Sequence, residues 1–271
     1  MGLNRPTALA TEIVQQISPV CVIQTRMGDL YCRGGHGRLV WRADTIYSEE
    51  PQTVGWLGSL TAGDVLWDVG ANVGLYALFA AKVTGCTVVA FEPEARNYAL
   101  LIENIALNHL NDRVLASNIP LYSTHSMGVL QIHAITQGGA YNEFISGLET
   151  RRATPEPNRI SQWQISTTAD ELVGSYGLPQ PTHIKLDVDG NEPDILCGAQ
   201  ETLANDVCKS VLVEVEDNEQ HRDMVKQLLG LGFKVMMERS NATSRRHLPH
   251  RPQVEHLLEK WHATNMIFIK S

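Results

Sequence analysis

Across most of this chain, short apolar runs rich in β-favouring residues alternate with longer segments of helical periodicity. The first two runs are 65–69 and 87–91, and an amphipathic segment follows each of them. In the second of these segments Tyr98, Leu101 and Ile105 recur at three- and four-residue spacing, which places them on one face of a helix. Because strands that alternate with helices form β-α-β units, the pattern predicts an α/β fold around a mostly parallel sheet.

The same periodicities predict the remaining elements of the chain. Further strands are expected at 113–118, 128–133, 183–187, 210–216, 233–237 and 265–269. Helices are expected from Val73, from Glu94, near 192–203 and over 218–231. Thr168 and Glu171 have the spacing of a capping box, which indicates the start of one more short helix.

The N-terminal part of the chain does not follow this alternation. Gly28 and Asp29 separate two short apolar runs at 20–25 and 30–32, and this arrangement predicts a β-hairpin. A hairpin and its flanks cannot bury a core of their own, so we expect residues 1–52 to be an extension rather than a separate domain.

Residues 53–271 are expected to form one main domain. The chain has 271 residues and 43% of them are hydrophobic, which is enough to bury a substantial core. Glycines and prolines interrupt the alternation over 120–180. We expect this stretch to be an insertion that shapes the mouth of a substrate site.

The charge of the chain bears on its partners. It carries 22 lysines and arginines against 30 acidic residues, a net charge of −8, which repels nucleic acid and anionic membranes. A small-molecule partner is therefore expected. A local basic run from Arg239 to Arg251 could bind an anionic substrate, but a solvated loop is the favoured interpretation.

Cysteine usage and hydropathy indicate the compartment. The five cysteines are widely spaced and contain no C-x-x-C pair, so neither a disulfide framework nor a zinc site is indicated. Residues 1–20 lack the apolar run of a signal peptide, and no later run approaches the roughly 18 apolar residues of a membrane span. These features predict a cytoplasmic protein and leave its oligomeric state open.

A glycine-rich turn follows the first strand of the main domain. Gly70 and Gly74 lie where a missing side chain lets the backbone approach a ligand, although a plain tight turn would also use glycine. Asn72 replaces the middle glycine of the dinucleotide fingerprint, which disfavours a phosphate ligand. Asp68, at the end of the strand, would instead suit an ammonium group.

An acidic residue ends the second strand. Dinucleotide-binding folds place the acid that binds the ribose hydroxyls roughly 20 residues beyond the glycine-rich turn, and Glu92 has this spacing. Pro93 stops the strand and helps fix the direction of Glu92. Alternatively, Glu92 could stabilise the positive N-terminus of the following helix. Turn and acid together favour a nucleoside-bearing cofactor.

Four segments of the chain occur in a recognisable order. They are the sequences DVGANVG at 68–74, FEPE at 91–94, NIALN at 104–108 and IKLDVDGNE at 184–192. Together they resemble the FkbM-type methyltransferases. The resemblance extends from about Glu50 to Phe268. It implies a Rossmann-like class I methyltransferase fold with a seven-stranded sheet, S-adenosylmethionine as the cofactor, and O-methylation of a sugar, glycolipid or secondary metabolite. The family often has glutamate where this chain has Asp189.

Ligands of open α/β sheets bind beyond the carboxyl ends of the strands, and this rule selects the expected cofactor residues. They are Asp68, Gly70, Ala71, Asn72, Gly74, Glu92, Pro93, Asn118, Ile119 and Asp187. The glycine-rich turn is assigned to the methionine part of the cofactor, Glu92 to its ribose, and Asn118 with Ile119 to its adenine.

Methyl transfer needs an aligned acceptor and removal of its hydroxyl proton. The expected catalytic residues are Lys185, Asp187, Asp189, Glu192 and His221. Asp187 or Asp189 could be the base or the anchor of the hydroxyl, or Lys185 and Asp187 could be a structural ion pair, since they alternate onto one strand face. His125 is an alternative base.

The same residues allow three other interpretations of the site. Asp187 with Glu214 or Glu216 could offer oxygen ligands to Mg²⁺, but neighbouring strand ends often carry carboxylates without a metal, and no metal ligand is predicted. An NAD-dependent oxidoreductase is favoured by Glu92 and opposed by Asn72. A non-catalytic protein that retains the cofactor pocket is a further alternative.

Overall fold

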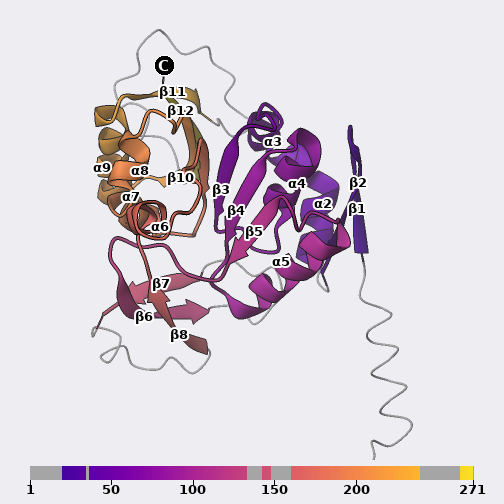
Figure 1. Ribbon diagram of the computed structural model, residues 1–271, viewed down its shortest axis with the longest axis horizontal. Coiled ribbons are helices and arrows are strands. Elements are labelled where there is room, and N and C mark those ends of the chain that lie inside the picture. The colour runs from indigo at the N-terminus through magenta and orange to yellow at the C-terminus, as the bar shows by residue number, and fades with distance from the viewer. Residues whose placement is uncertain (1–19, 35–36, 133–141, 148–159, 239–262, 271) are drawn as a thin grey trace, which may run out of the picture.

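The computed structural model describes residues 20–34, 37–132, 142–147, 160–238 and 263–270. Its centre is a seven-stranded sheet in the order β11-β12-β10-β9-β3-β4-β5 (Figure 1). The strands are β3 (Val65–Val69), β4 (Thr87–Phe91), β5 (Val114–Ser117), β9 (His183–Leu186), β10 (Ser210–Glu216), β11 (Phe233–Glu238) and β12 (Ala263–Lys270). Only β12 pairs antiparallel to its neighbours. The predicted mostly parallel, seven-stranded α/β fold is confirmed.

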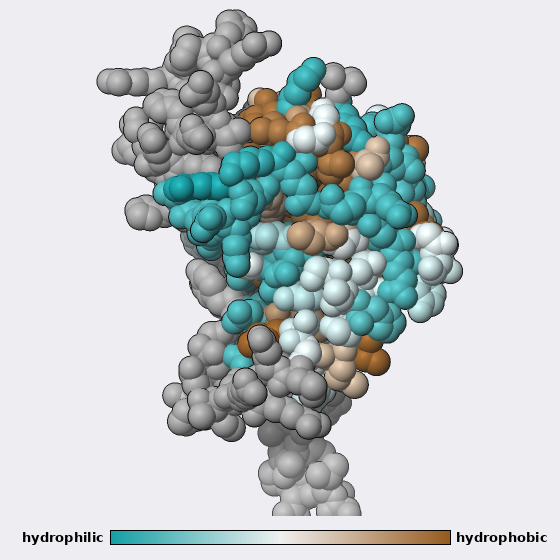
Figure 2. Space-filling model, turned by 90° about the vertical axis from the view of Figure 1, so that its left-hand side faces the viewer, coloured by the Kyte–Doolittle hydropathy of each residue, from teal (hydrophilic) through white to brown (hydrophobic). Residues whose placement is uncertain are grey.

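Helices cover both faces of this sheet (Figure 1). One face carries α2 (Gly37–Glu49), α3 (Pro51–Leu57), α4 (Leu75–Thr84) and α5 (Ala95–Leu107). The other carries α6 (Ala169–Gly174), α7 (Glu192–Cys197), α8 (Gln200–Ala204) and α9 (Glu219–Gly230). The outer surface on the α9 side is mostly hydrophilic (Figure 2). The capping box is present, because the Thr168 side chain accepts a hydrogen bond from the Glu171 N–H.

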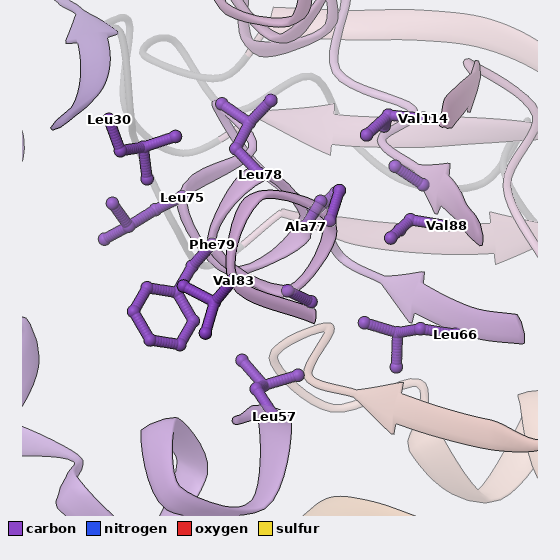
Figure 3. Close-up of a cluster of buried hydrophobic side chains, with 14 of the residues drawn as sticks. Leu30, Leu57, Leu66, Leu75, Ala77, Leu78, Phe79, Val83, Val88 and Val114 are labelled. Carbon is purple, nitrogen blue, oxygen red and sulfur yellow. The ribbon is translucent and has the colours of Figure 1, made fainter. Parts of the chain in front are cut away.

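Each face of the sheet has its own hydrophobic core. Successive strand residues point to opposite faces, so Leu66 packs under α4 whereas Trp67 packs on the α9 side. In the first core, Leu78 of α4 lies among side chains from the sheet, from α3 and from the N-terminal hairpin (Figure 3). The two cores cover both faces of the sheet, so a ligand can reach it only at the ends of its strands.

The strand order reverses direction between β3 and β9. From β3 the chain winds through β4 to β5 on one side, and it later returns to place β9 on the other. At such a switch point the loops that leave neighbouring strands turn in opposite directions and open a crevice where ligands bind. The topology therefore places the site at the carboxyl ends of β3 and β9.

The predicted N-terminal hairpin is present as β1 (Val20–Thr25) and β2 (Gly28–Arg33). The outer edge of β2 pairs with two side chains of α5. Asn108 receives the Tyr31 N–H (2.8 Å) and donates to the Tyr31 carbonyl (2.6 Å), and Asn104 does the same for Arg33 (2.6 and 3.2 Å). Asn104 also donates to the Val73 carbonyl (3.0 Å), which links the hairpin to the glycine-rich turn. The domain boundary at 52/53 stays a prediction.

A three-stranded antiparallel sheet, in the order β7-β6-β8, occupies the described parts of the 120–180 stretch. Its strands are β6 (Ser126–Ile132), β7 (Glu143–Ser146) and β8 (Ile160–Ser166), of which only the first was predicted. Gln162 and Gln164 both donate to the Pro93 carbonyl (2.7 Å each), so this sheet stands over the end of β4. Two parts of the predicted insertion, 133–141 and 148–159, lie outside the described residues, as does the basic run 239–251.

Two further differences concern helices. Neither α2 nor α3 was predicted, although Ala43, Ile46 and Tyr47 of α2 have the three- and four-residue spacing of an amphipathic helix. The helix expected near 192–203 is divided into α7 and α8 at Gly198. A Cβ at this position would lie 2.2 Å from the Tyr122 carbonyl oxygen, so the break coincides with a close backbone contact that requires glycine. Within the described ranges, no helix has the length and apolar character that crossing a membrane requires.

Candidate active site

The turn between β3 and α4 is pressed against the end of β9. A Cβ on Gly70 would lie 1.9 Å from the carbonyl oxygen of Asp187, so only glycine allows this approach. Asn72 and Gly74 also have positive φ angles, of 52° and 92°. Asparagine is one of the few side chains that tolerate this region, which explains why Asn72 can replace a glycine here. The turn therefore has one tightly defined path.

The backbone N–H groups of this turn are all bonded within the protein. Gly70 and Ala71 donate to the Phe91 carbonyl (3.0 and 2.9 Å), and Gly74 donates to Ala71 (2.8 Å). The Asn72 N–H donates to Oε2 of Glu92 (2.7 Å), and the Val73 N–H to the side chain of Asn72 (2.9 Å). In dinucleotide-binding folds such N–H groups point at the phosphates. Here none of the five is left for a phosphate.

Glu92 lies at the end of β4 and is only 5% exposed. Besides the Asn72 N–H, it accepts the Glu94 N–H at Oε1 (2.9 Å). Burial raises the pKa of Glu92 to about 7, although these hydrogen bonds oppose the shift. Glu94, rather than Glu92, caps the following helix by accepting the Asn97 N–H (2.8 Å). The capping role considered for Glu92 therefore belongs to its neighbour.

A buried lysine joins two aspartates. Lys185 Nζ lies 2.9 Å from Oδ2 of Asp187 and 3.7 Å from Oδ1 of Asp68, with the ring of Tyr76 5.2 Å away. Burial opposes the charge of Lys185, but the two carboxylates outweigh it and raise the pKa of the ammonium. Burial likewise raises the pKa of Asp68, whereas Lys185 lowers that of Asp187. Lys185 is thus a fixed cation that holds Asp187 ionised.

The segment after β9 forms a sharp turn around Glu192. Glu192 accepts the N–H of Val188 at Oε1 and that of Gly190 at Oε2, both at 2.9 Å. Asp189, between them, has a positive φ of 60°. His221 Nε2 lies 3.7 Å from Oε2 of Glu192.

His221 is itself buried and fixed by the main chain. Its Nδ1 accepts the Glu216 N–H (2.6 Å), so the proton of a neutral ring is on Nε2, which faces Glu192. Burial lowers the pKa of His221 and raises that of Glu192 to about 7. Both side chains lie behind the turn, whereas Asp187 and Asp189 line the cleft in front of it.

The cleft at the switch point is open to solvent on one side and comprises about 520 Å³ of empty space. It is lined by Arg42, Gly70, Asn72, Glu92, Pro93, Leu130, Asn142, Asp187, Val188 and Asp189. A second, more apolar hollow of about 350 Å³ continues from it and is lined by Ile119, Pro120, Leu121 and Phe144 among others. Asn142 borders both hollows, and its Oδ1 is buried and finds no hydrogen-bond partner among the residues that the structure describes.

The structure brings half of the predicted site residues to these hollows, namely Gly70, Asn72, Glu92, Pro93, Ile119, Asp187 and Asp189. The other half line neither hollow: Asp68, Ala71, Gly74, Asn118, Lys185, Glu192 and His221. The carbonyl of Asn118 instead accepts a hydrogen bond from Gln164 (3.1 Å). Arg42, Leu130 and Asn142 were not predicted. They come from α2 and from the small sheet, where the chain carries no motif, so only the three-dimensional structure identifies them.

A metal centre was considered for Asp187 with Glu214 or Glu216. Burial, together with repulsion from Asp187, raises the pKa of Glu214 to about 8. In the part of the chain that the structure describes, no group of three or more histidine, cysteine or acidic side chains could hold a metal ion.

Comparison with known proteins identifies the family. The model of the methyltransferase FkbM domain matches residues 68–235. The hexuronic acid methyltransferase AglP of Haloferax volcanii is 28% identical over 190 residues, 70% of this chain and 71% of that protein. The 31-O-demethyl-FK506 methyltransferase FkbM of Streptomyces tacrolimicus is 27% identical over 198 residues, covering 66% and 76%. A crystal structure of methyltransferase FkbM from Methylobacillus flagellatus aligns with a TM-score of 0.49 and 14% identity, over 85% of this chain and 53% of that one. The chain belongs to the FkbM methyltransferase family.

Proposed function

We propose that this methyltransferase takes its methyl group from S-adenosylmethionine and transfers it to a hydroxyl of a small molecule such as a sugar, glycolipid or secondary metabolite. The charge pattern of the cleft carries the proposal. Its walls present the carboxyl groups of Glu92, Asp187 and Asp189, while the N–H groups of the 70–74 turn are already bonded. Such a cleft attracts a cationic sulfonium, and its glycine-rich turn has no backbone N–H left for a pyrophosphate, which opposes the NAD alternative.

The two hollows fit different parts of this cofactor. The carboxylate of Glu92 accepts the backbone N–H groups of Asn72 and Glu94 and a side-chain hydrogen bond from Asn97, so one of its four lone pairs is left for a ribose hydroxyl. The apolar hollow beside Ile119 and Phe144 suits an adenine ring. The unpartnered Oδ1 of Asn142 suits the amino group of adenine, because a buried acceptor is costly without a donor. When bound, the cofactor would supply an electrophilic methyl group.

The carboxylates at the end of β9 are assigned different tasks. Asp187 is held ionised by Lys185, and we assign it to the ammonium group of the cofactor. Asp189, which lines the same cleft, is assigned to the acceptor hydroxyl and its proton. The names of the two relatives describe a hexuronic acid and a 31-O position, and both support an oxygen acceptor on a small molecule.

Calorimetric titration tests the cofactor. S-adenosylmethionine and S-adenosylhomocysteine would be titrated into the wild type, into Glu92→Ala and into Glu103→Ala, which removes an exposed acid of α5 as a control. Saturable binding is expected for the wild type and the control. Glu92→Ala should weaken it by about tenfold or more, because it removes charged hydrogen bonds worth roughly 1.5–3 kcal/mol.

Two results would contradict the proposed function. If neither compound binds the wild type and NADH does, the oxidoreductase alternative replaces it. If S-adenosylmethionine binds but no acceptor in a panel of uronic acids, sugars and polyketide alcohols yields S-adenosylhomocysteine, the non-catalytic alternative is favoured.

A further inference from the structure

The helix α2 brings an arginine to the cleft from a part of the chain that carries no family motif. Ala43 and Ile46 are buried in the core beneath α4, next to Phe79. Tyr47 donates its hydroxyl hydrogen to the main chain of β1 (2.8 Å) and meets the Phe79 ring edge-on, with centroids 6.1 Å apart. The backbone of α2 is therefore anchored, and Arg42, half-buried beside Ala43, lines the cleft from a fixed position.

Among the described residues that line this cleft, Arg42 is the one with a basic side chain. Within the described ranges it makes no hydrogen bond and no ion pair, although its charge helps to lower the pKa of Asp187. The other nearby cation, Lys185, is already bonded to Asp187, and its side chain is only 2% exposed. The guanidinium of Arg42 therefore has N–H donors available for a ligand.

The cofactor proposed above requires such a donor. Its amino-acid end carries one ammonium and one carboxylate, and Asp187 matches the ammonium. The glycine-rich turn cannot serve the carboxylate through its backbone, because the N–H groups from Gly70 to Gly74 are bonded within the protein. A guanidinium is the side chain best shaped to pair with a carboxylate through two parallel hydrogen bonds.

We infer that Arg42 binds the carboxylate of the cofactor's amino-acid end, so that Arg42 and Asp187 together recognise a zwitterion across the cleft. This inference rests on the proposed function, because it needs S-adenosylmethionine as the ligand. It also gives α2, which precedes the segment matched by the family model, a direct part in cofactor binding.

A pair of ligands isolates the contact. S-adenosylmethionine and its decarboxylated form differ in the carboxylate alone, and both would be titrated calorimetrically into the wild type and into Arg42→Met. The variant should bind S-adenosylmethionine about ten- to a hundredfold more weakly, which is the range of a charged hydrogen-bonded pair. Its affinity for the decarboxylated compound should stay within about twofold to threefold of the wild type.

The controls separate a lost contact from a damaged fold. Arg26→Met removes an exposed arginine that donates to the Gly58 carbonyl (3.2 Å), and it should leave both affinities unchanged. If Arg42→Met does not fold, Arg42→Lys keeps the charge but loses the two-pronged geometry, and it should weaken only S-adenosylmethionine. Equal weakening of both ligands, or no change in either, would overturn the inference. Failure of the wild type to bind either ligand would instead contradict the proposed function.

Discussion

The acidic residues at the end of β9 differ in what their oxygens already bind. Both oxygens of Glu192 accept N–H groups of the turn, and the side chain is 1% exposed. This turn contains Asp189 and Gly190 with φ angles of 60° and 125°, a conformation that needs support. The geometry therefore favours a positioning role for Glu192, and for His221 behind it. The catalytic roles suggested by the sequence stay predictions.

Replacing Glu192 by glutamine tests this role. An amide cannot accept both N–H groups, because its nitrogen is a donor, so one turn hydrogen bond is lost inside the protein. We expect the free energy of unfolding in urea to fall by about 1–3 kcal/mol. Glu219→Gln, at an exposed position of α9, should leave it unchanged. Unaltered stability with a loss of turnover by roughly 10²–10⁴ would show that Glu192 is the catalytic acid or base.

At the level of elements, the segment 104–108 explains how the hairpin is attached. Asn104 and Asn108 lie four residues apart on α5, so both point to one side of the helix. Their amides pair with the backbone of β2 as a neighbouring strand would, and this satisfies an edge that is otherwise prone to pair with other chains. A motif shared with the family thus has a structural role here.

Asn108→Ala should loosen this attachment. The change leaves the N–H and the carbonyl of Tyr31 without partners, so we expect a loss of about 1–3 kcal/mol in the free energy of unfolding. Hydrogen exchange at the Tyr31 amide should become faster. Asn111→Ala, just beyond α5 and exposed, is the matched control. If the exchange rate and the stability match the wild type, the asparagine pairs do not hold the hairpin.

Some strands could be predicted from the sequence and others could not, for physical reasons. The strands 65–69, 87–91 and 210–216 were predicted with their observed bounds, because most of their residues are apolar, rich in valine and buried on both faces of the sheet. The strand β8 was missed because its pattern is inverted. Trp163 and Ile165 are exposed, whereas Gln162 and Gln164 turn inward to the Pro93 carbonyl. A polar inward face gives no hydrophobic period to detect. Arg42 was missed for another reason: α2 is amphipathic, but an arginine on it belongs to no motif that indicates a site.

At the scale of the whole molecule, the two edges of the sheet have different polar chemistry. At the amino-terminal edge, Asp64 bonds Lys209 (2.8 Å) and lies 3.5 Å from His183, and Ser210 bonds both His183 (2.6 Å) and Trp56 (2.9 Å). These groups satisfy one another and tie α3 to the sheet. At the carboxyl-terminal edge the acidic groups face a cleft, and burial raises the pKa of several of them. Ligand binding in this cleft should therefore be accompanied by uptake or release of protons.

Glu92 gives this coupling a defined sign. Its pKa is about 7 in the folded chain and about 4.5 when unfolded, so its contribution to folding is full below pH 4.5 and is lost as the pH rises through 7. Ribose hydroxyls donate to the ionised carboxylate, so the cofactor should lower this pKa and release a proton. Affinity for S-adenosylhomocysteine should accordingly rise between pH 5.5 and 8, by at most about tenfold per pH unit, and level off above 7.

Thermal unfolding of the full chain measures this effect. The increase in Tm caused by a fixed concentration of S-adenosylhomocysteine should be larger at pH 8 than at pH 6, because tighter binding to the folded state gives more stabilisation. Titrations in buffers of different ionisation enthalpy should report proton release near pH 6. Glu92→Gln cannot ionise and should bind with little dependence on pH. If that variant keeps the pH dependence of the wild type, the proton belongs to another group, and Glu192, with a pKa of about 7, is the next to test.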